Sequence, residues 1–94
     1  MYTYPFSDAE EELKSAVWEK GGTASGFPQD QWRYDVCGTL IKYSEHGNIN
    51  SPNGWEIDHI VPCAIGGSNT LDNLQPLQWG NNRNKGDSYP WTCT

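Results

Sequence analysis

The chain is poor in positive charge. It has six Lys and Arg residues against twelve Asp and Glu, which gives a formal net charge of −6 over 94 residues. Proteins that hold nucleic acid by bulk electrostatic attraction carry an excess of basic side chains. The composition argues against that mode of binding, so any phosphate-binding surface must be local and assisted by a metal cation.

Paired cysteines are also missing. Cys37, Cys63 and Cys93 are far apart, and no C-x-x-C spacing occurs. This excludes the usual zinc knuckle built from paired thiolates. An odd, scattered set is typical of reduced thiols in an intracellular protein. We therefore expect free thiols, and one disulfide with a single free cysteine is the alternative that the sequence leaves open.

No long hydrophobic run is present either. Nothing approaches the apolar length of a membrane span. The first residues, "MYTYPFSDAEEE", lack the basic and apolar regions of a signal peptide. We expect an intracellular, cytoplasmic protein with no membrane partner. Its length predicts one small domain, residues 1–94.

The first half of the chain predicts a helix followed by strands. In "SDAEEELKSAVWEKGG", Ser7 and Glu10 form a capping box, and Gly21 with Gly22 ends the helix. Its expected packing stripe consists of Ala9, Leu13, Ala16 and Val17. Residues 32–60 alternate well enough to predict strands, with turns near residues 37–38 and 46–54.

The second half predicts a loop, a short strand and a helix. Residues 61–73 are rich in Pro, Gly, Asn and Ser, which favours an ordered loop. "LQPLQ" is a short strand that Pro76 confines to irregular or edge pairing. "WGNNRNKGD" follows as two helical turns ended by Gly86.

The stretch "WEIDHIVP" places two polar residues among β-type residues. Asp58 is a hard oxygen ligand suited to Mg²⁺, and His59 is a natural general base near neutral pH. Strand alternation would point them to opposite faces, so the strand must end or bulge there, as Pro62 supports. Alone, the pair is compatible with a hydrogen-bonded structural histidine.

The surrounding pattern resembles the HNH endonucleases. Asn73 lies fourteen residues after His59, Asn82 nine residues further on, and Lys85 three after that. The match covers "WEIDHIVPCAIGGSNTLDNLQPLQWGNNRNKGD", residues 55–87. The resemblance implies an α+β fold with a small ββα-metal core of β-hairpin plus helix. The N-terminal helix and the strands of residues 33–43 would brace this core.

The resemblance also implies roles for the motif residues. Asp58 matches a metal ligand, and His59 matches the general base that deprotonates the attacking water. Asn73 matches the middle Asn, which orients the catalytic His, with loop support alone as the alternative. Asn82 matches the second metal ligand in the Asn variant, as in the HNH domain of RNA-guided CRISPR nucleases. Asn81 is the rival for that role, but its side chain points about 100° away on a helix.

The sequence departs from many family members in one respect. The family often carries C-x-x-C pairs around the core, but the positions near the third motif residue are Gln78 and Asn81 here. No structural zinc is therefore expected. Aromatic packing by Trp55 and Trp79 would take the place of the cross-link that a structural zinc ion provides. Core filling is the dominant expected role for these two rings and for Trp32 and Trp91.

These observations predict a metal-dependent endonuclease. We expect one divalent ion, Mg²⁺ or Mn²⁺, and hydrolysis of phosphodiester bonds in nucleic acid, with DNA as the expected substrate. Arg83 and Lys85 are the candidates for phosphate contact, ahead of Arg33 and Lys42. The alternatives are a non-catalytic nucleic-acid-binding or structural module that retains the fold, and a toxin-type effector. The acidic balance favours a protein partner that supplies affinity or specificity.

Overall fold

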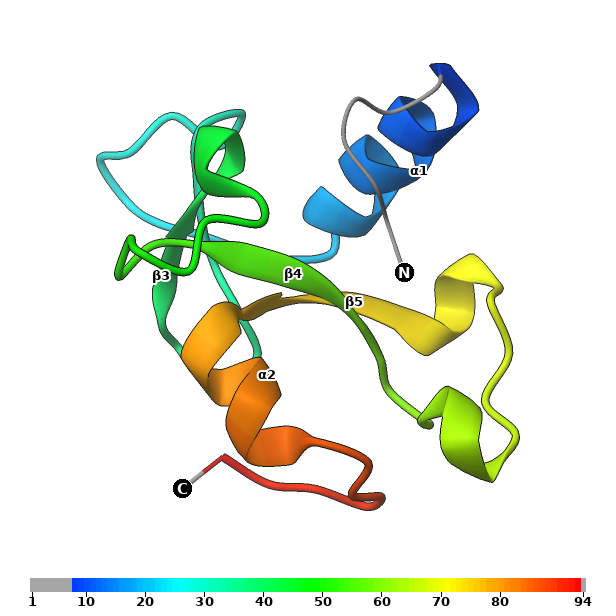
Figure 1. Ribbon diagram of the computed structural model, residues 1–94. Coiled ribbons are helices and arrows are strands. Elements are labelled where there is room, and N and C mark those ends of the chain that lie inside the picture. The colour runs from blue at the N-terminus through cyan, green and yellow to red at the C-terminus, as the bar shows by residue number, and fades with distance from the viewer. Residues whose placement is uncertain (1–7, 94) are drawn as a thin grey trace.

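The computed structural model describes residues 8–93, which form two helices and two small antiparallel sheets (Figure 1). The elements are α1 (Asp8–Trp18), β1 (Gly22–Thr23), β2 (Trp32–Tyr34), β3 (Leu40–Lys42), β4 (Trp55–His59), β5 (Leu74–Gln78) and α2 (Trp79–Lys85). Short 3-10 turns lie at η1 (Tyr43–Glu45), η2 (Cys63–Ile65) and η3 (Leu71–Asn73). This arrangement confirms the predicted α+β class with a hairpin-helix core.

Helix α1 packs against β5 and supplies part of the core. Leu13 and Ala16 are partly buried and Val17 is fully buried, in keeping with the predicted packing stripe. The stripe omitted Trp18, which is only 3% exposed. The predicted capping box involves Ser7, which lies outside the described residues, and the side chain of Ala9 in the predicted stripe is likewise not described.

Aromatic rings join the two halves of the molecule. Trp18, Ile41 and Trp55 form the buried cluster, and the ring centroids of the two tryptophans are 5.1 Å apart. Trp55 therefore fills the core as predicted, whereas Trp32, Trp79 and Trp91 are only partly buried. Because Trp55 begins β4, this cluster fixes the hairpin relative to α1 and the first sheet.

The β4–β5 hairpin holds the central motif. Strand pairing is antiparallel, with Asp58 opposite Gln75 and His59 opposite Leu74. Pro76 lies opposite Ile57 in this two-stranded sheet, so its missing N–H is tolerated at an edge, as predicted. Leu74 is fully buried. Strand β4 ends at His59, which meets the requirement that the strand end at the Asp-His pair.

The expectation of three free thiols was wrong. Cys37 and Cys93 form a disulfide with a Cα–Cα distance of 5.5 Å, and Cys63 is free and exposed. The bond attaches the C-terminal tail to the turn between β2 and β3, and Figure 1 shows the tail running beneath α2. The cysteines are 56 residues apart, so no local spacing indicated the pair. The disulfide removes one of the two arguments for an intracellular location.

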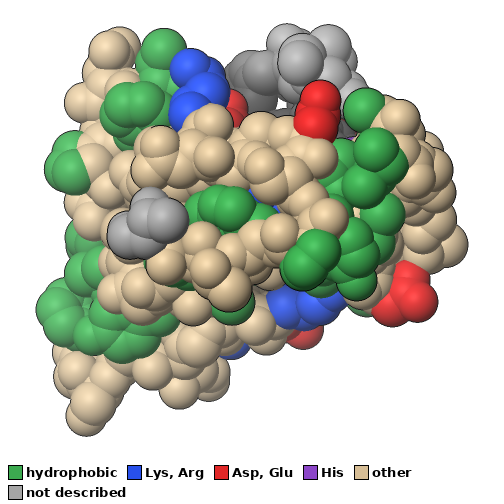
Figure 2. All heavy atoms as spheres, turned by 90° about the horizontal axis from the view of Figure 1, so that it is seen from below, with side chains coloured by type: hydrophobic (Ala, Val, Ile, Leu, Met, Phe, Trp, Pro, Cys, Tyr) green, Lys and Arg blue, Asp and Glu red, His purple; other side chains and the backbone are tan. Residues whose placement is uncertain are grey.

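Basic side chains are sparse on the surface seen from below. In Figure 2, Lys and Arg side chains are scattered on that face, among uncharged polar atoms and separate hydrophobic groups. No broad basic patch is visible there. Within residues 8–93, neither helix has the length and apolar character needed to cross a membrane.

Candidate active site

An open cleft of about 640 Å³ lies beside the end of β4. Its walls come from the residues that follow η1, from β4, from the η2 turn, from α2 and from the residues directly after α2. The polar side chains that line it include Glu56, Asp58, His59, Asn82, Arg83 and Asp87. The cleft therefore brings both predicted metal ligands and the predicted base to one place.

Asp58 is a buried carboxylate held by two partners. Its exposure is 6%, and Oδ2 accepts a hydrogen bond from Gln75 Nε2 at 2.9 Å. Oδ1 lies 3.3 Å from Lys85 Nζ. Gln75 stands opposite Asp58 in the hairpin register, so the strand pairing itself places this partner. The carboxylate is thereby fixed at the cleft wall.

Lys85 has a different environment from the one that a phosphate contact requires. Its exposure is 3%, and Nζ donates to the carbonyl oxygen of His59 at 2.8 Å as well as pairing with Asp58. The ammonium group thus links the end of α2 to both residues of the Asp-His pair. The position of Lys85 at the end of a short helix suggested an exposed side chain, but α2 directs this side chain into the interior of the protein.

His59 is oriented by the loop that follows it. Its Nε2 atom lies 2.7 Å from the side-chain oxygen Oδ1 of Asn69. A carboxamide oxygen only accepts, so Nε2 is the donor and the neutral ring carries its lone pair on Nδ1. The contact leaves Nδ1 as the basic atom of the ring.

Asn73 organises the loop between the two hairpin strands. Its Oδ1 accepts from the Val61 amide at 2.9 Å, and its Nδ2 donates to the carbonyl oxygens of Val61 and Ser68 at 3.0 and 2.8 Å. Its own carbonyl oxygen accepts from the Ile60 amide at 2.8 Å. These bonds fix the backbone directly after His59, which agrees with the loop-support alternative. A direct catalytic part for Asn73 stays a prediction.

Gly67 is required by the same loop. A Cβ atom added there would lie 1.6 Å from the carbonyl oxygen of Val61. The Gly67 amide donates to the Pro62 carbonyl at 2.9 Å, so the chain passes very close to its own backbone. The Gly-Gly sequence therefore permits the tight return that carries Asn69 to His59.

The two neighbouring asparagines of α2 point in different directions. Asn81 Nδ2 donates to Asp35 Oδ2 at 2.9 Å and to Thr39 Oγ1 at 3.0 Å, on the side of the first sheet. Asn82 lines the cleft, and its Nδ2 donates to Glu56 Oε1 at 2.8 Å. This placement favours Asn82 over Asn81 as the second ligand.

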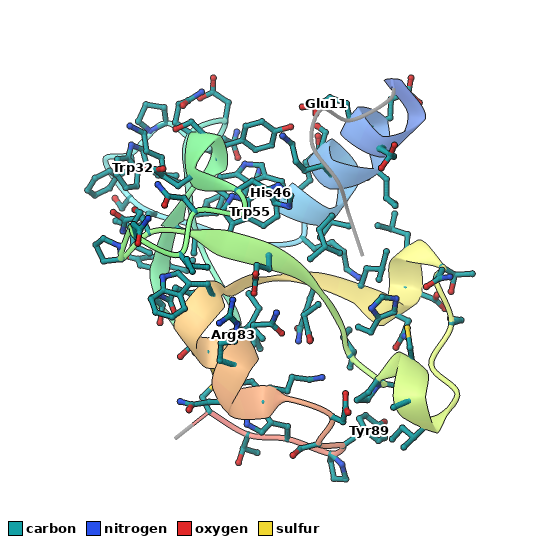
Figure 3. All side chains as sticks on the ribbon, in the orientation of Figure 1. Glu11, Trp32, His46, Trp55, Arg83 and Tyr89 are labelled. Carbon is teal, nitrogen blue, oxygen red and sulfur yellow. A yellow bond between two sulfur atoms is a disulfide. The ribbon has the colours of Figure 1, made fainter. Side chains whose placement is uncertain are left out.

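Arg83 lies at the rim of the cleft. It extends from α2 toward β4 (Figure 3), and its side chain is 58% exposed. Its guanidinium lies 3.8 Å from Glu56 Oε2 and 5.8 Å from the centre of the Trp79 ring. Of the two predicted phosphate contacts, Arg83 is the one that faces solvent.

All of the residues that line this cleft lie within a segment that matches a known family. Residues 39–91, more than half of the chain, match the family model described as HNH endonuclease. The chain belongs to the HNH endonuclease family. The comparisons with curated proteins and with solved structures found no match.

The HNH family is usually endonucleolytic and typically uses a divalent metal. Asp58 and Asn82 offer oxygen donors at one cleft, which suits Mg²⁺ or Mn²⁺. Among residues 8–93, no three His, Cys, Asp or Glu side chains are grouped to hold a metal ion. A site of one carboxylate, one carboxamide and water needs no such group. The residues fit a hard divalent cation.

Two contacts of this HNH site were not predicted from the sequence, that of Glu56 with Asn82 and that of Asn69 with His59. Glu56 precedes Asp58 by two positions, so strand alternation places both on the same face, and this relation was available in advance. Asn69 lies in an irregular loop, where nothing in the local sequence indicated a contact with His59.

Proposed function

We propose that this HNH protein is a metal-dependent endonuclease that hydrolyses phosphodiester bonds in DNA. The observation that carries the proposal is the meeting of Asp58, His59 and Asn82 at one cleft. The first two come from the end of β4 and the third from α2, and each is held by a different partner. Such preorganisation is what positioned acid-base catalysis needs.

In the proposal, His59 acts as the general base. Asn69 engages Nε2, so Nδ1 is the atom that takes a proton from the attacking water. The bond to Asn69 also keeps the imidazole from rotating about its side-chain torsions. A neutral ring is required for this step, because only the neutral imidazole has a lone pair that can take the proton.

Asp58 and Asn82 would hold the divalent ion, Mg²⁺ or Mn²⁺. When bound, that ion supplies a Lewis acid that stabilises negative charge on the phosphoryl group and the leaving oxygen. Lys85 offsets part of the charge of Asp58 from behind, at 3.3 Å, so the buried carboxylate is not left unpaired. Gln75 holds the other carboxylate oxygen.

Substrate binding in this proposal is weak and local. The net charge of −6 opposes general attraction to DNA, and Arg83 is the exposed basic side chain in the cleft lining. We therefore expect a shallow salt dependence that reflects few phosphate contacts. A protein partner would supply the affinity and specificity that this small acidic surface lacks.

The proposal predicts metal-dependent nicking of plasmid DNA. Purified protein is incubated with supercoiled and linear DNA in Mg²⁺, Mn²⁺ or EDTA, and products are resolved on gels. Loss of the base in His59→Ala should lower the rate by about 10²- to 10⁴-fold and leave Mn²⁺ binding intact by calorimetry. Asp58→Asn should lower metal affinity and rate together.

The matched control is Asn84→Ala, which removes an exposed asparagine from the same helix. It should cleave like the wild type, and circular dichroism checks the folding of every variant. DNA retardation without cleavage under any metal condition would instead identify a binding module that retains the HNH fold. Near wild-type cleavage by folded His59→Ala would remove His59 as the base.

A further inference from the structure

We propose that Glu56 is a positioning residue that turns the carboxamide oxygen of Asn82 toward the metal site. The inference rests on the proposed function and concerns a residue outside the Asp-His-Asn motif. Its basis is the 2.8 Å hydrogen bond from Asn82 Nδ2 to Glu56 Oε1, made between two residues that both line the cleft.

A carboxamide has two orientations of nearly the same shape, related by a half-turn. One of them presents Oδ1 to the cleft, and the other presents Nδ2, which cannot bind a cation. Glu56 is an acceptor when ionised, so it pairs with Nδ2 and repels Oδ1. The carboxylate therefore selects the orientation in which Oδ1 is directed away from Glu56 and remains for the ion.

Glu56 is itself held in place. It lies two residues before Asp58 on β4, so both side chains point to the same side of the hairpin, toward α2. Its second oxygen, Oε2, lies 3.8 Å from the Arg83 guanidinium, which is one residue beyond Asn82. The side chain is 28% exposed, so one oxygen serves Asn82 while the other faces the rim.

Charge and hydrogen bonding at Glu56 can be separated by substitution. Glu56→Ala removes both, and loss of a partner that orients a metal ligand typically lowers metal affinity by about 10- to 100-fold. Glu56→Gln removes the charge and keeps an oxygen that can accept from Asn82, so its loss of affinity should be several-fold smaller. Asp87→Ala removes an equal charge from the same cleft without breaking a hydrogen bond to Asn82, and should resemble Glu56→Gln or the wild type.

Calorimetric titration with Mn²⁺ measures these affinities, and single-turnover plasmid cleavage at rising Mn²⁺ supplies a second readout. A positioning defect in Glu56→Ala should be largely overcome at high Mn²⁺, because the base and the first ligand are intact. If Glu56→Gln loses affinity as fully as Asp58→Asn, then Glu56 is a ligand and the inference is overturned. Equal losses in Glu56→Gln and Glu56→Ala would assign the effect to charge and overturn it as well.

A double-mutant cycle tests the contact without metal. In EDTA, Asn82→Asp places two carboxylates against each other and should lower the melting temperature. Adding Glu56→Gln supplies a donor amide for the new carboxylate and should restore it, so the two changes should couple. Additive effects would mean that the two side chains do not interact, which refutes the inference.

The two proposals fail in different ways. A wild-type protein that neither binds Mn²⁺ nor cleaves DNA refutes the proposed function, and with it any positioning for metal. A wild-type enzyme that cleaves, beside a Glu56→Ala variant of unchanged Mn²⁺ affinity, refutes the positioning role alone.

Discussion

At the scale of single residues, the pairing of Lys85 with Asp58 connects stability to the site. Both side chains are almost fully buried, with exposures of 3% and 6%. A buried ion pair contributes little net stability, but removing one partner leaves the other charge unpaired in a poorly solvated place. Lys85 therefore supports the carboxylate that the proposed function needs, from inside the fold.

Lys85→Met should consequently destabilise the protein by about 3 kcal/mol, because it strands the Asp58 carboxylate. Methionine preserves most of the aliphatic volume, so the change removes the charge and the hydrogen bond to the His59 carbonyl oxygen with little loss of packing. Urea denaturation measures the free energy of unfolding. The control is Arg83→Met at the exposed rim, which should change stability by less than about 0.5 kcal/mol while weakening DNA retardation.

The opposite pattern would restore the role predicted from sequence. A Lys85→Met variant of wild-type stability with weakened DNA binding would make Lys85 a phosphate contact. Sequence reasoning assigned Asp58, His59 and Asn82 to one site because their spacing is a family pattern, and all three line the same cleft. It did not reach the burial of Lys85 or the link between Glu56 and Asn82, since both depend on how α2 packs on β4.

At the scale of elements, a buried carboxylate anchors α2 to the first sheet. Asp35 is 6% exposed and follows β2 directly. Its Oδ1 accepts from the amides of Cys37 and Thr39 at 3.0 and 2.8 Å. Its Oδ2 accepts from the Gln78 amide at 3.0 Å and from Asn81 Nδ2 at 2.9 Å. One side chain thus fixes the β2–β3 turn and the start of α2 together.

Asp35→Ala should destabilise the fold by about 3 kcal/mol or more, because it leaves several buried donors without an acceptor. Loss of the anchor should also lower cleavage, since α2 carries Asn82. Chemical denaturation and plasmid nicking measure the two effects. Asp30→Ala removes an exposed carboxylate and should leave both nearly unchanged. An unaltered unfolding midpoint in Asp35→Ala would show that α2 is anchored by other contacts.

A second coupling between elements involves His46, which follows η1. Its ring packs against Trp55 at 4.6 Å between centroids, and Figure 3 shows the two side by side. Burial and, to a smaller extent, the Lys14 ammonium lower the pKa of His46 to about 4, and the Glu11 carboxylate opposes this shift. Glu11 itself is paired with Lys14 and with the Tyr43 hydroxyl.

The lowered pKa predicts acid sensitivity. An unfolded histidine has a pKa of about 6.5, so between roughly pH 6.5 and 4 the unfolded chain binds a proton that the folded chain does not. The contribution of His46 is therefore complete above pH 6.5 and is lost as the pH falls toward 4. After allowance for partial exposure of the ring, we expect a loss of about 1 to 2 kcal/mol.

Urea unfolding at a series of pH values measures this loss, and His46→Phe should flatten the slope while keeping a ring on Trp55. The slope of the free energy of unfolding against pH is compared between the wild type and His46→Phe from pH 6.5 to 4.5. The pKa of Glu11 is lowered from 4.5, chiefly by its hydrogen bond with Lys14, so its own contribution disappears only below that window. A slope that persists in His46→Phe would assign the acid sensitivity to other groups.

At the scale of the whole molecule, the disulfide between Cys37 and Cys93 cross-links a chain that has few long helices or strands. Local patterns of β-type residues, Gly and Pro predicted strand β5 and helix α2 with nearly correct bounds, whereas the hairpin was implied by the resemblance to the HNH family. The disulfide between Cys37 and Cys93 could not be derived in that way. It depends on the tail passing beneath α2 to the β2–β3 turn, which is a property of the completed fold (Figure 1).

This bond predicts a large effect of reduction on stability. Closing a loop between cysteines 56 residues apart restricts the unfolded chain by about 4 kcal/mol in the chain-entropy account. Cys37→Ser with Cys93→Ser should therefore lower the melting temperature, and a thiol reductant should lower that of the wild type but leave the variant unchanged. Cys63→Ser, which removes the exposed free thiol, is the matched control and should melt like the wild type in both conditions.

Alkylation with iodoacetamide and mass measurement count the thiols directly. The denatured, unreduced protein should take up one alkyl group, at Cys63, and the reduced protein three. Three groups without reduction would restore the prediction of free thiols made from the sequence. If the count is one, reduction also tests how the tail supports the site. Because the disulfide holds the tail beneath α2, its loss should loosen the helix that carries Asn82, and Mn²⁺ affinity should then fall together with stability.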